Sequence, residues 1–383
     1  MALRLFFVFT IPLHPDVGFL PGYNDEPLHL HYVQHLADGK GWPVYEPTGD
    51  IAIDHLRGEF VQPPLYYKSV VPAYKLGEFV KLGWGMYAVR LMSVLYGILA
   101  GVFAYRTAYI WTNRRRIARF TLAAMMLAPN AVIFTSLVSN DALLICLSAM
   151  TIYSLTLCRQ PRSKGVRMVL TGAFLAAALW VKLSAIVLVP LIVFCAPQNT
   201  KLRNWLANSS RVFATFSLII MPMIIWSVAN YGYAYPGGGV PMQTQYLPEV
   251  AVGVSGGAIH HPLMATKIFL RTASMPIADL WGSPLEKIIS SLWLLAWSIF
   301  LLIGMTVSVF KKNLSYMFLA AVIIMTTAFI FRSLFLFQVE FRLYAPIFLI
   351  LSILTALGYE RLNLPLWLYA ILWSAPFAIV PFA

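Results

Sequence analysis

Long apolar runs alternate with short basic clusters and longer polar segments along most of this chain. The runs 86–111 and 142–157 are predicted to cross a membrane as helices. The run 168–196 is too long for one span and too short for two, and Lys182 interrupts it, which predicts two shortened helices that meet at Lys182. At about 20 residues per span, the apolar runs predict an all-α protein with roughly ten or eleven transmembrane helices.

Two polar segments, 14–85 and 231–286, separate these runs and are predicted to be long loops on the outer side of the membrane. Residues 117–137 are expected to return to that side before a tight turn at 138–141. We found neither an internal repeat nor a composition shift that would mark a soluble domain. The prediction is therefore a single multispanning domain over residues 1–383.

The composition agrees with this architecture. Hydrophobic residues make up 60% of the 383 residues and charged residues 11%, with a mean hydropathy of +0.73. Soluble globular chains have about 45–50% apolar and about 25% charged residues. A water-soluble enzyme is therefore excluded, and an integral membrane protein is indicated.

The net charge is +13, and the basic residues lie where membrane proteins usually carry them. Basic clusters such as Arg114–Arg116 and Lys311–Lys312 lie between apolar runs, which is typical of cytoplasmic loops and argues against nucleic acid as a partner. Of the 15 acidic residues, only Glu360 lies beside such a cluster. The acidic side chains, and the chemistry that they can support, therefore face outward.

The first outer loop contains two adjacent carboxylates and an imidazole. Asp25, Glu26 and His29 fall within the first turns of a predicted amphipathic helix over 25–38, so the i,i+3 and i,i+4 spacings place them on one side. Such a group offers a general base and a site for a divalent cation, Mg or Mn, with Zn also allowed. The alternative is an acidic first turn stabilised by the helix dipole.

Three further features carry candidate chemistry. The segment 63–67, with two prolines and two tyrosines, reads locally as an interfacial anchor, and Asp141 at the tight outer turn is either a helix cap or a functional carboxylate. Lys182 and Arg342 are charges at membrane depth, which usually face a cavity, although snorkelling to the interface is the alternative. A lipid with a phosphate headgroup would satisfy both cations.

Five short motifs follow one another from the first outer loop to the late apolar runs, each in a fitting topological place. Each is weak alone, but together and in order they are fairly specific. They are Asp25-Glu26 followed by His29 and Tyr32, Pro63-Pro64-Leu65-Tyr66-Tyr67, Ser139-Asn140-Asp141, Lys182-Leu183-Ser184, and Arg342-Leu343-Tyr344-Ala345-Pro346.

This series resembles the membrane glycosyltransferases of the GT-C superfamily, nearest the protein O-mannosyltransferase and aminoarabinose transferase branch. The resemblance extends over nearly the whole chain. It implies an enzyme that takes a sugar from a polyprenyl-phosphate carrier and passes it, with inversion, to a protein, glycolipid or polysaccharide acceptor at the outer face. Hexosyl and pentosyl transfer both remain open.

The resemblance also implies roles for single residues. Asp25 matches the general base, and Glu26 the second acid, which orients the acceptor or holds a metal. Arg342 would bind the carrier phosphate, and Lys182 would neutralise the leaving phosphate. The remaining candidate substrate-binding residues are His29, Tyr66, Tyr67, Asp141 and Tyr344.

Two departures from the family pattern stand out. Gln62 precedes the two prolines where some relatives have a basic residue, which leaves phosphate binding to Lys182 and Arg342. No soluble C-terminal domain is expected from the pattern, so recognition of the acceptor by an appended domain is expected to be absent or to be supplied by a partner. The expected location is a bacterial inner membrane, among membrane lipids, with the site facing the periplasm or exterior.

Two other classes of protein share some of these features. A lipid or solute transporter, or flippase, also needs interrupted helices and intramembrane cations, but no repeat is found and the charges gather on one side. An assembly subunit could use the outer loops as docking surfaces. Asp25, Glu26 and His29 gathered beside a lipid-accessible cavity would favour the enzyme.

Overall fold

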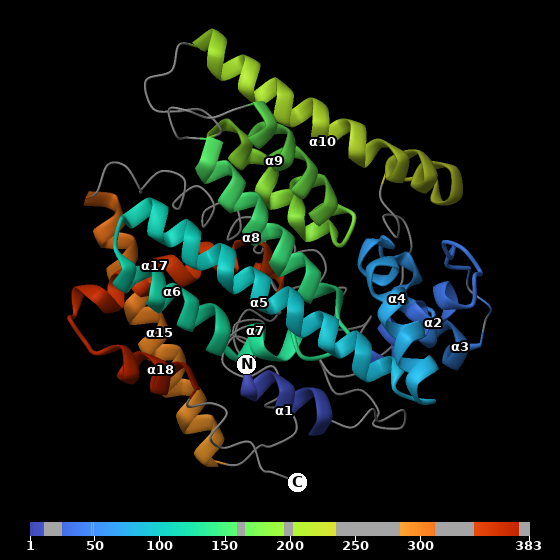
Figure 1. Ribbon diagram of the computed structural model, residues 1–383, viewed down its shortest axis with the longest axis horizontal. Helices are drawn as coiled ribbons and strands as arrows, with labels where there is room; N and C mark the ends of the chain where they lie inside the picture. Colours follow the sequence, from blue (N-terminus) through green and yellow to red (C-terminus); the bar gives the residue numbers. More distant parts are fainter. Residues whose placement is uncertain are drawn as a thin grey trace, which may run out of the picture.

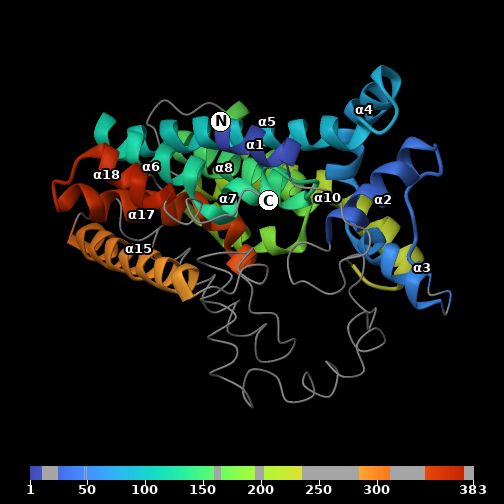
Figure 2. The ribbon, with the colours of Figure 1, turned by 90° about the horizontal axis from the view of Figure 1, so that it is seen from below.

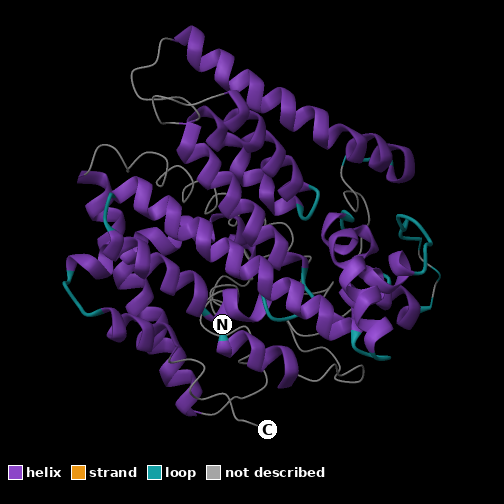
Figure 3. Ribbon diagram, in the orientation of Figure 1, coloured by secondary structure: helices purple, strands orange, loops and turns teal. Residues whose placement is uncertain are grey.

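The computed structural model describes residues 1–10, 25–46, 48, 50–158, 165–194, 202–234, 284–310 and 341–374. Within these ranges every regular element is a helix and no strand occurs (Figure 3). The all-α fold class is therefore confirmed. The helices are α1 (Ala2–Thr10), α2 (Asp25–Ala37), α3 (Ile51–Leu56), η1 (Gly58–Val61), α4 (Leu65–Val80), α5 (Gly85–Thr112), α6 (Arg115–Leu127), α7 (Pro129–Phe134), α8 (Asn140–Cys158), α9 (Gly165–Leu179), η2 (Leu183–Phe194), α10 (Leu202–Tyr231), α15 (Pro284–Phe310), η3 (Phe341–Ile347), α17 (Phe348–Arg361) and α18 (Leu366–Ser374).

Three of the described helices, α5, α8 and α10, are long and apolar enough to cross a membrane. Shorter apolar helices lie over Gly165–Leu179, Leu183–Ile192 and Leu292–Ser308. These findings support an integral membrane protein. The number of spans, ten or eleven, stays a prediction, as does the assignment of 14–85 and 231–286 to outer loops.

The helices form four groups around α8 (Figure 1). Helix α5 packs against α8, and α6 packs against α5. Helices α9 and α10 cover one flank, and α15, α17 and α18 lie on the other. Helices α2, α3 and α4 gather at one end of α5 (Figure 2). The last group is where most of the polar motifs of the first loop are found.

Helix α8 is the core of the bundle because almost every side of it is buried. A helix that is apolar all round needs neighbours on every face. Two of its threonine hydroxyls are satisfied within the helix, since Thr151 and Thr156 donate to the carbonyls four residues earlier, each at 2.8 Å, whereas the buried Ser148 hydroxyl has no hydrogen-bond partner among the described residues. Such bonds let hydroxyl side chains sit in an apolar interior without an unpaired donor.

The helix break at Lys182 is present. Helix α9 ends at Leu179, and η2 begins at Leu183, so Lys182 lies between two shortened helices as the apolar run predicted. The second piece is a 3-10 helix that contains Pro190. Proline lacks a backbone donor and disturbs a regular α-helical ladder.

One predicted span is divided. Residues 117–137 were expected to form a continuous return segment, but α6 ends at Leu127 and the short α7 starts at Pro129. Ala128 between them is extended, with φ −60° and ψ 131°. A residue before proline is sterically driven out of the α region, and this restriction explains the break.

Candidate functional site

A buried ion pair fixes the start of α2. Arg90 on α5 donates to both carboxylate oxygens of Glu26, from Nε at 2.8 Å and from Nη2 at 2.7 Å. The Arg90 side chain is fully buried, and that of Glu26 is 5% exposed. This bidentate geometry is among the strongest that side chains make, because charge and directionality act together.

The same pair joins two more segments to α2. The backbone N–H of Val138 donates to Glu26 Oε1 at 2.7 Å, and Arg90 Nη1 donates to the carbonyl of Val8 at 2.8 Å. One carboxylate thus connects α2, α5 and the turn before α8, while the guanidinium reaches α1. Glu26, the residue that follows Asp25, therefore fixes the position of the first turn of α2.

A second buried cluster lies one turn further along α2. The Tyr67 hydroxyl donates to Glu59 Oε2 at 3.2 Å and lies 2.8 Å from His29 Nδ1, and His29 Nδ1 is 3.5 Å from Glu59 Oε2. The Tyr67 hydroxyl thus links the imidazole of His29 to the carboxylate of Glu59. Burial, followed by the charge of Glu59, raises the pKa of Tyr67 well above its ordinary value.

Aromatic packing holds this cluster in place. The rings of Tyr32 and Tyr67 stack with centroids 3.8 Å apart, and the Tyr32 hydroxyl donates to the Gln62 carbonyl at 3.2 Å. Tyr66 is buried next to Tyr67 and lies 3.2 Å from the Ser93 hydroxyl of α5, and burial raises its pKa. The tyrosines of the Pro-Pro-Leu-Tyr-Tyr motif are therefore interior residues and not exposed interfacial anchors.

The third element is an ion pair between two predicted residues. Lys182 Nζ lies 2.8 Å from Asp141 Oδ1, and the Asp141 side chain is only 1% exposed. The Ser139 hydroxyl accepts the backbone N–H of Asp141 at 3.2 Å. The side-chain amide of Asn140 is buried, and neither its oxygen nor its nitrogen has a hydrogen-bond partner.

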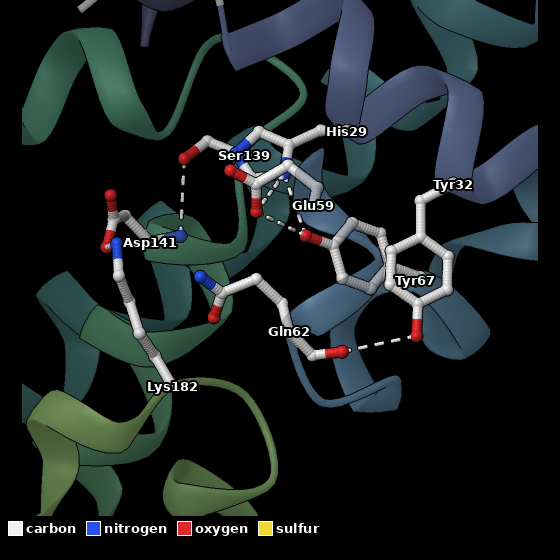
Figure 4. Close-up of polar contacts among 8 residues, drawn as sticks. All are labelled: His29, Tyr32, Glu59, Gln62, Tyr67, Ser139, Asp141 and Lys182. Carbon is white, nitrogen blue, oxygen red and sulfur yellow. Dashed lines mark hydrogen bonds and ion pairs between the residues drawn. The ribbon is translucent and has the colours of Figure 1, made fainter. Parts of the chain in front are cut away.

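The second cluster and the Asp141–Lys182 pair face a common region (Figure 4). His29, Glu59 and Tyr67 lie on one side of it, and the Asp141–Lys182 pair lies on the other, with the Gln62 side chain directed between them. The backbone also links the two sides, because the Leu65 N–H donates to the Trp180 carbonyl at 3.3 Å. Residues far apart in the sequence thus meet at the end of the bundle where α2–α4 gather.

The structure leaves part of the predicted set undetermined. The backbone of Asp25 is the first residue of α2 and that of Arg342 lies in η3, but the side chains of both residues lie outside the described part of the chain. Tyr344, also in η3, is buried. The roles of these three residues stay predictions.

Glu26 and His29 do not share a metal site in the described structure. Both oxygens of Glu26 face the Arg90 guanidinium, and His29 Nδ1 is bound to Tyr67, so these donors do not fit a cation between them. Among the described residues, no group of three or more His, Cys, Asp or Glu side chains could hold a metal ion. The divalent cation therefore depends on Asp25 and stays a prediction.

Sequence reasoning missed two residues of this site. Arg90 lies within the apolar run 86–111, where an intramembrane arginine was itself a signal of a buried partner. Glu59 stands four residues before the first proline of the second motif, and only the fold brings it to His29.

One family profile matches the chain. It is described as dolichyl-phosphate-mannose-protein mannosyltransferase and covers residues 67–226. That range includes Tyr67, Asp141 and Lys182 of the site. No curated protein sequence gives a significant match.

Solved structures with the same fold come from two kinds of protein. The crystal structure of ArnT from Cupriavidus metallidurans bound to undecaprenyl phosphate is 17% identical, with a TM-score of 0.52 over 94% of this chain and 58% of ArnT. The oligosaccharyltransferase of Archaeoglobus fulgidus in complex with zinc and sulfate is 13% identical, with a TM-score of 0.59 over 100% of this chain and 51% of that protein. The archaeal AglB, from the same organism, in complex with an inhibitory peptide and a dolichol-phosphate is also 13% identical, with a TM-score of 0.55 over 98% and 51% of the two chains.

At these identities the likeness establishes the fold. The chain spans 58% of the length of ArnT and about half of the archaeal oligosaccharyltransferase. Together with the family profile, the two folds confirm the resemblance to the GT-C superfamily that the five motifs indicated.

Proposed function

We propose that this protein is a membrane glycosyltransferase that moves a sugar from a polyprenyl-phosphate carrier to an acceptor hydroxyl. The observation that carries the proposal is the Asp141–Lys182 pair, which sets a cation at a helix break beside the buried first-loop cluster. A structural neighbour binds undecaprenyl phosphate and another binds a dolichol-phosphate. Both ligands carry the lipid phosphate that Lys182 is suited to bind.

The proposed chemistry is a single displacement. Asp25 removes the proton of the acceptor hydroxyl as the oxygen attacks the anomeric carbon on the face opposite the phosphate. The bond from the anomeric carbon to the phosphate oxygen breaks, and its electron pair leaves with the phosphate. One displacement inverts the anomeric configuration.

The leaving group sets the need for positive charge. A departing lipid phosphate develops negative charge, and preorganised cations in a water-poor site stabilise it strongly. Lys182 and Arg342 take this role in the proposal. Because phosphate leaves without a proton, no general acid is required and one carboxylate is enough for the base.

Glu26 is proposed as the positioning residue for that base. Its bonds to Arg90 and to the Val138 N–H hold the first turn of α2 against α5 and α8. Asp25 is the preceding residue of the same turn. A shift of about 1 Å in a reacting group can cost about 100-fold in rate, which gives a rigid clamp its value.

The proposed location is a bacterial inner membrane, with the site facing the periplasm or exterior. The sugar, hexose or pentose, and the acceptor, a protein, glycolipid or polysaccharide, are to be identified by assay. The peptide bound to archaeal AglB supports including peptides among the acceptors tested.

The test uses purified protein in lipid nanodiscs with a panel of radiolabelled polyprenyl-phosphate sugars and a cell-envelope extract as acceptor source. We expect the wild type to release label from one carrier, and Asp25→Asn to be at least about 100-fold slower. Asp38→Asn is the matched control, because Asp38 is an exposed aspartate just past α2 that pairs with Lys40 on the surface. Its rate should equal that of the wild type.

Two results would contradict the proposal at different points. A wild type that binds carriers and never cleaves any of them would exclude the transferase and direct attention to lipid transport. Equal turnover by the wild type and a folded Asp25→Asn variant would keep the reaction and exclude Asp25 as its base.

A further inference from the structure

The corner between α4 and α5 exposes large apolar side chains at successive positions. Phe79 and Leu82 are each 88% exposed, and Val80 and Trp84 are exposed beside them. Lys81 lies in the middle of this group. We call residues 79–84 the α4–α5 corner.

The corner is held in a defined shape and is not a loose loop. The Glu78 carboxylate accepts the backbone N–H groups of Gly83 at 3.1 Å and Gly85 at 2.8 Å. Gly83 has φ +83°, a conformation that favours glycine. Lys81 Nζ lies 5.4 Å from the centre of the Trp84 ring, so the cation and the aromatic face stay together.

Its place in the chain puts the corner at a membrane boundary. Helix α5, which begins at Gly85, is one of the three helices able to cross a membrane. Helix α4 runs across the end of α5 and projects beyond the edge of the bundle (Figure 2). A corner at the end of a spanning helix lies at the depth of the lipid headgroups.

We propose that the α4–α5 corner is a membrane anchor that inserts its apolar side chains into the interfacial layer of the adjacent leaflet, with Lys81 on the phosphate of an anionic phospholipid. Tryptophan and lysine are the residues that occupy this layer, one through its amphipathic ring and the other through its long apolar stem. The positive charge of Lys81 selects lipid phosphate over a neutral surface. Glu78 does not cancel this charge at the surface, because its carboxylate is used within the turn.

The anchor has a consequence for the site that does not depend on the reaction. Helix α4 carries the corner at its end and Tyr66 with Tyr67 at its start. Insertion of the corner therefore fixes α4 against the bilayer and steadies the helix that supports Glu59 and His29 through Tyr67.

The experiment measures depth with a fluorophore. Leu82→Cys carries an environment-sensitive NBD label in nanodiscs, and wild-type protein labelled in parallel gives the background from native cysteines. Glu46→Cys, an exposed loop position away from the corner, is the control. We expect the Leu82 label to be quenched by lipid-borne nitroxide and shielded from aqueous iodide, and the Glu46 label to behave in the opposite way.

Quenching of the Leu82 label by iodide to the same extent as the Glu46 label would overturn the anchor. Phe79→Cys repeats the measurement at a second position, so that one badly labelled variant cannot decide the result.

The phosphate contact has its own test. Nitroxide-labelled phosphatidylglycerol and phosphatidylcholine are compared as quenchers of the Leu82 label, which gives the relative occupancy of the corner by the two lipids. We expect about a fivefold preference for phosphatidylglycerol, typical of one lysine at an anionic surface, and its loss in Lys81→Gln. An equal preference in both proteins would overturn the assignment of Lys81 to lipid phosphate.

Discussion

The two carboxylate oxygens of Glu26 each accept a hydrogen bond from the guanidinium of Arg90, so a residue within α5 fixes the first turn of α2. The pair is buried, and the fork of the guanidinium contacts both oxygens while Nη1 also reaches the Val8 carbonyl. The first loop is therefore held to the bundle at the residue next to the proposed base.

Arg90→Lys is expected to weaken this connection although it keeps the charge. A lysine ammonium cannot reproduce the planar fork of arginine, so at least one of the two hydrogen bonds from residue 90 to Glu26 is lost. Hydrogen bonds to charged groups contribute about 1.5–3 kcal/mol, and a lower melting temperature should follow. Sugar transfer should fall about tenfold or more, because the start of α2 is no longer fixed.

The control for this prediction is Arg106→Lys, an exposed arginine on the same helix. Both variants are compared by thermal melting in nanodiscs and by the carrier-cleavage assay. Full stability and activity in Arg90→Lys would show that Glu26 does not need the bidentate contact.

Lys182→Met is expected to leave Asp141 as a buried charge without its cation. Removing one member of a buried pair costs about 3–5 kcal/mol, so the variant should melt well below the wild type. The double variant Asp141→Asn/Lys182→Met removes both charges and should recover most of the stability. Sugar transfer should not recover, because Lys182, one of the two cations proposed for the leaving phosphate, is still missing.

The double variant is therefore expected to regain thermal stability without regaining sugar transfer. Recovery of both properties would show that Lys182 serves only as the partner of Asp141. Thermal melting and carrier cleavage on the same preparation are the two measurements.

The elements that sequence could predict were those that depend on local pattern. The helix over 25–38 is present as α2, and Gly39 after it has φ +78°, as a helix stop requires. The break at Lys182 followed from a run of the wrong length with a charge in the middle. Each of these features is determined by a few neighbouring residues.

Features that depend on distant contacts were less accessible. The expectation that Asp25, Glu26 and His29 share one space considered α2 alone, whereas α5 draws Glu26 to Arg90 and η1 draws Glu59 to His29. Arg4 is similar: it is buried at the end of α6, where it donates to the Met126 carbonyl at 2.6 Å and to the Thr135 hydroxyl at 2.7 Å. No spacing rule along the chain reveals such partners.

Gly358→Ala is expected to push helices α15 and α17 apart. A Cβ at Gly358 on α17 would overlap the backbone carbonyl of Phe300 on α15, and one at Gly304 would overlap the carbonyl of Leu354. Small residues at such crossings let backbones approach closely in membrane proteins. Because the obstacle is backbone and not a flexible side chain, the variant should lose about 1–3 kcal/mol and melt at a lower temperature.

Gly165→Ala is the matched control, since a Cβ there would meet only Arg211 Nη1 at 3.8 Å. It should melt like the wild type. Equal melting of both variants would mean that α15 and α17 can move apart without loss of stability.

The acid sensitivity of α2 should depend on His31 and His35. Burial, and then the positive charges of Arg57 and Lys40, hold the pKa of His31 below its ordinary value of 6.5, and burial with Lys40 does the same for His35. Both rings contact Phe60, with centroids 5.5 and 4.9 Å away. Their environment in the folded protein therefore favours the neutral form.

A lowered pKa in the folded state means that the unfolded segment binds protons more strongly. As the pH falls below about 6.5, the unfolded form gains protons that the folded form does not, and the stability of α2 falls with it. We expect hydrogen exchange over residues 25–37, corrected for intrinsic rates, to be several times faster relative to the rest of the bundle at pH 5 than at pH 7.5. The double variant His31→Gln/His35→Gln should lose most of this difference, and an unchanged difference would assign the acid sensitivity to other groups.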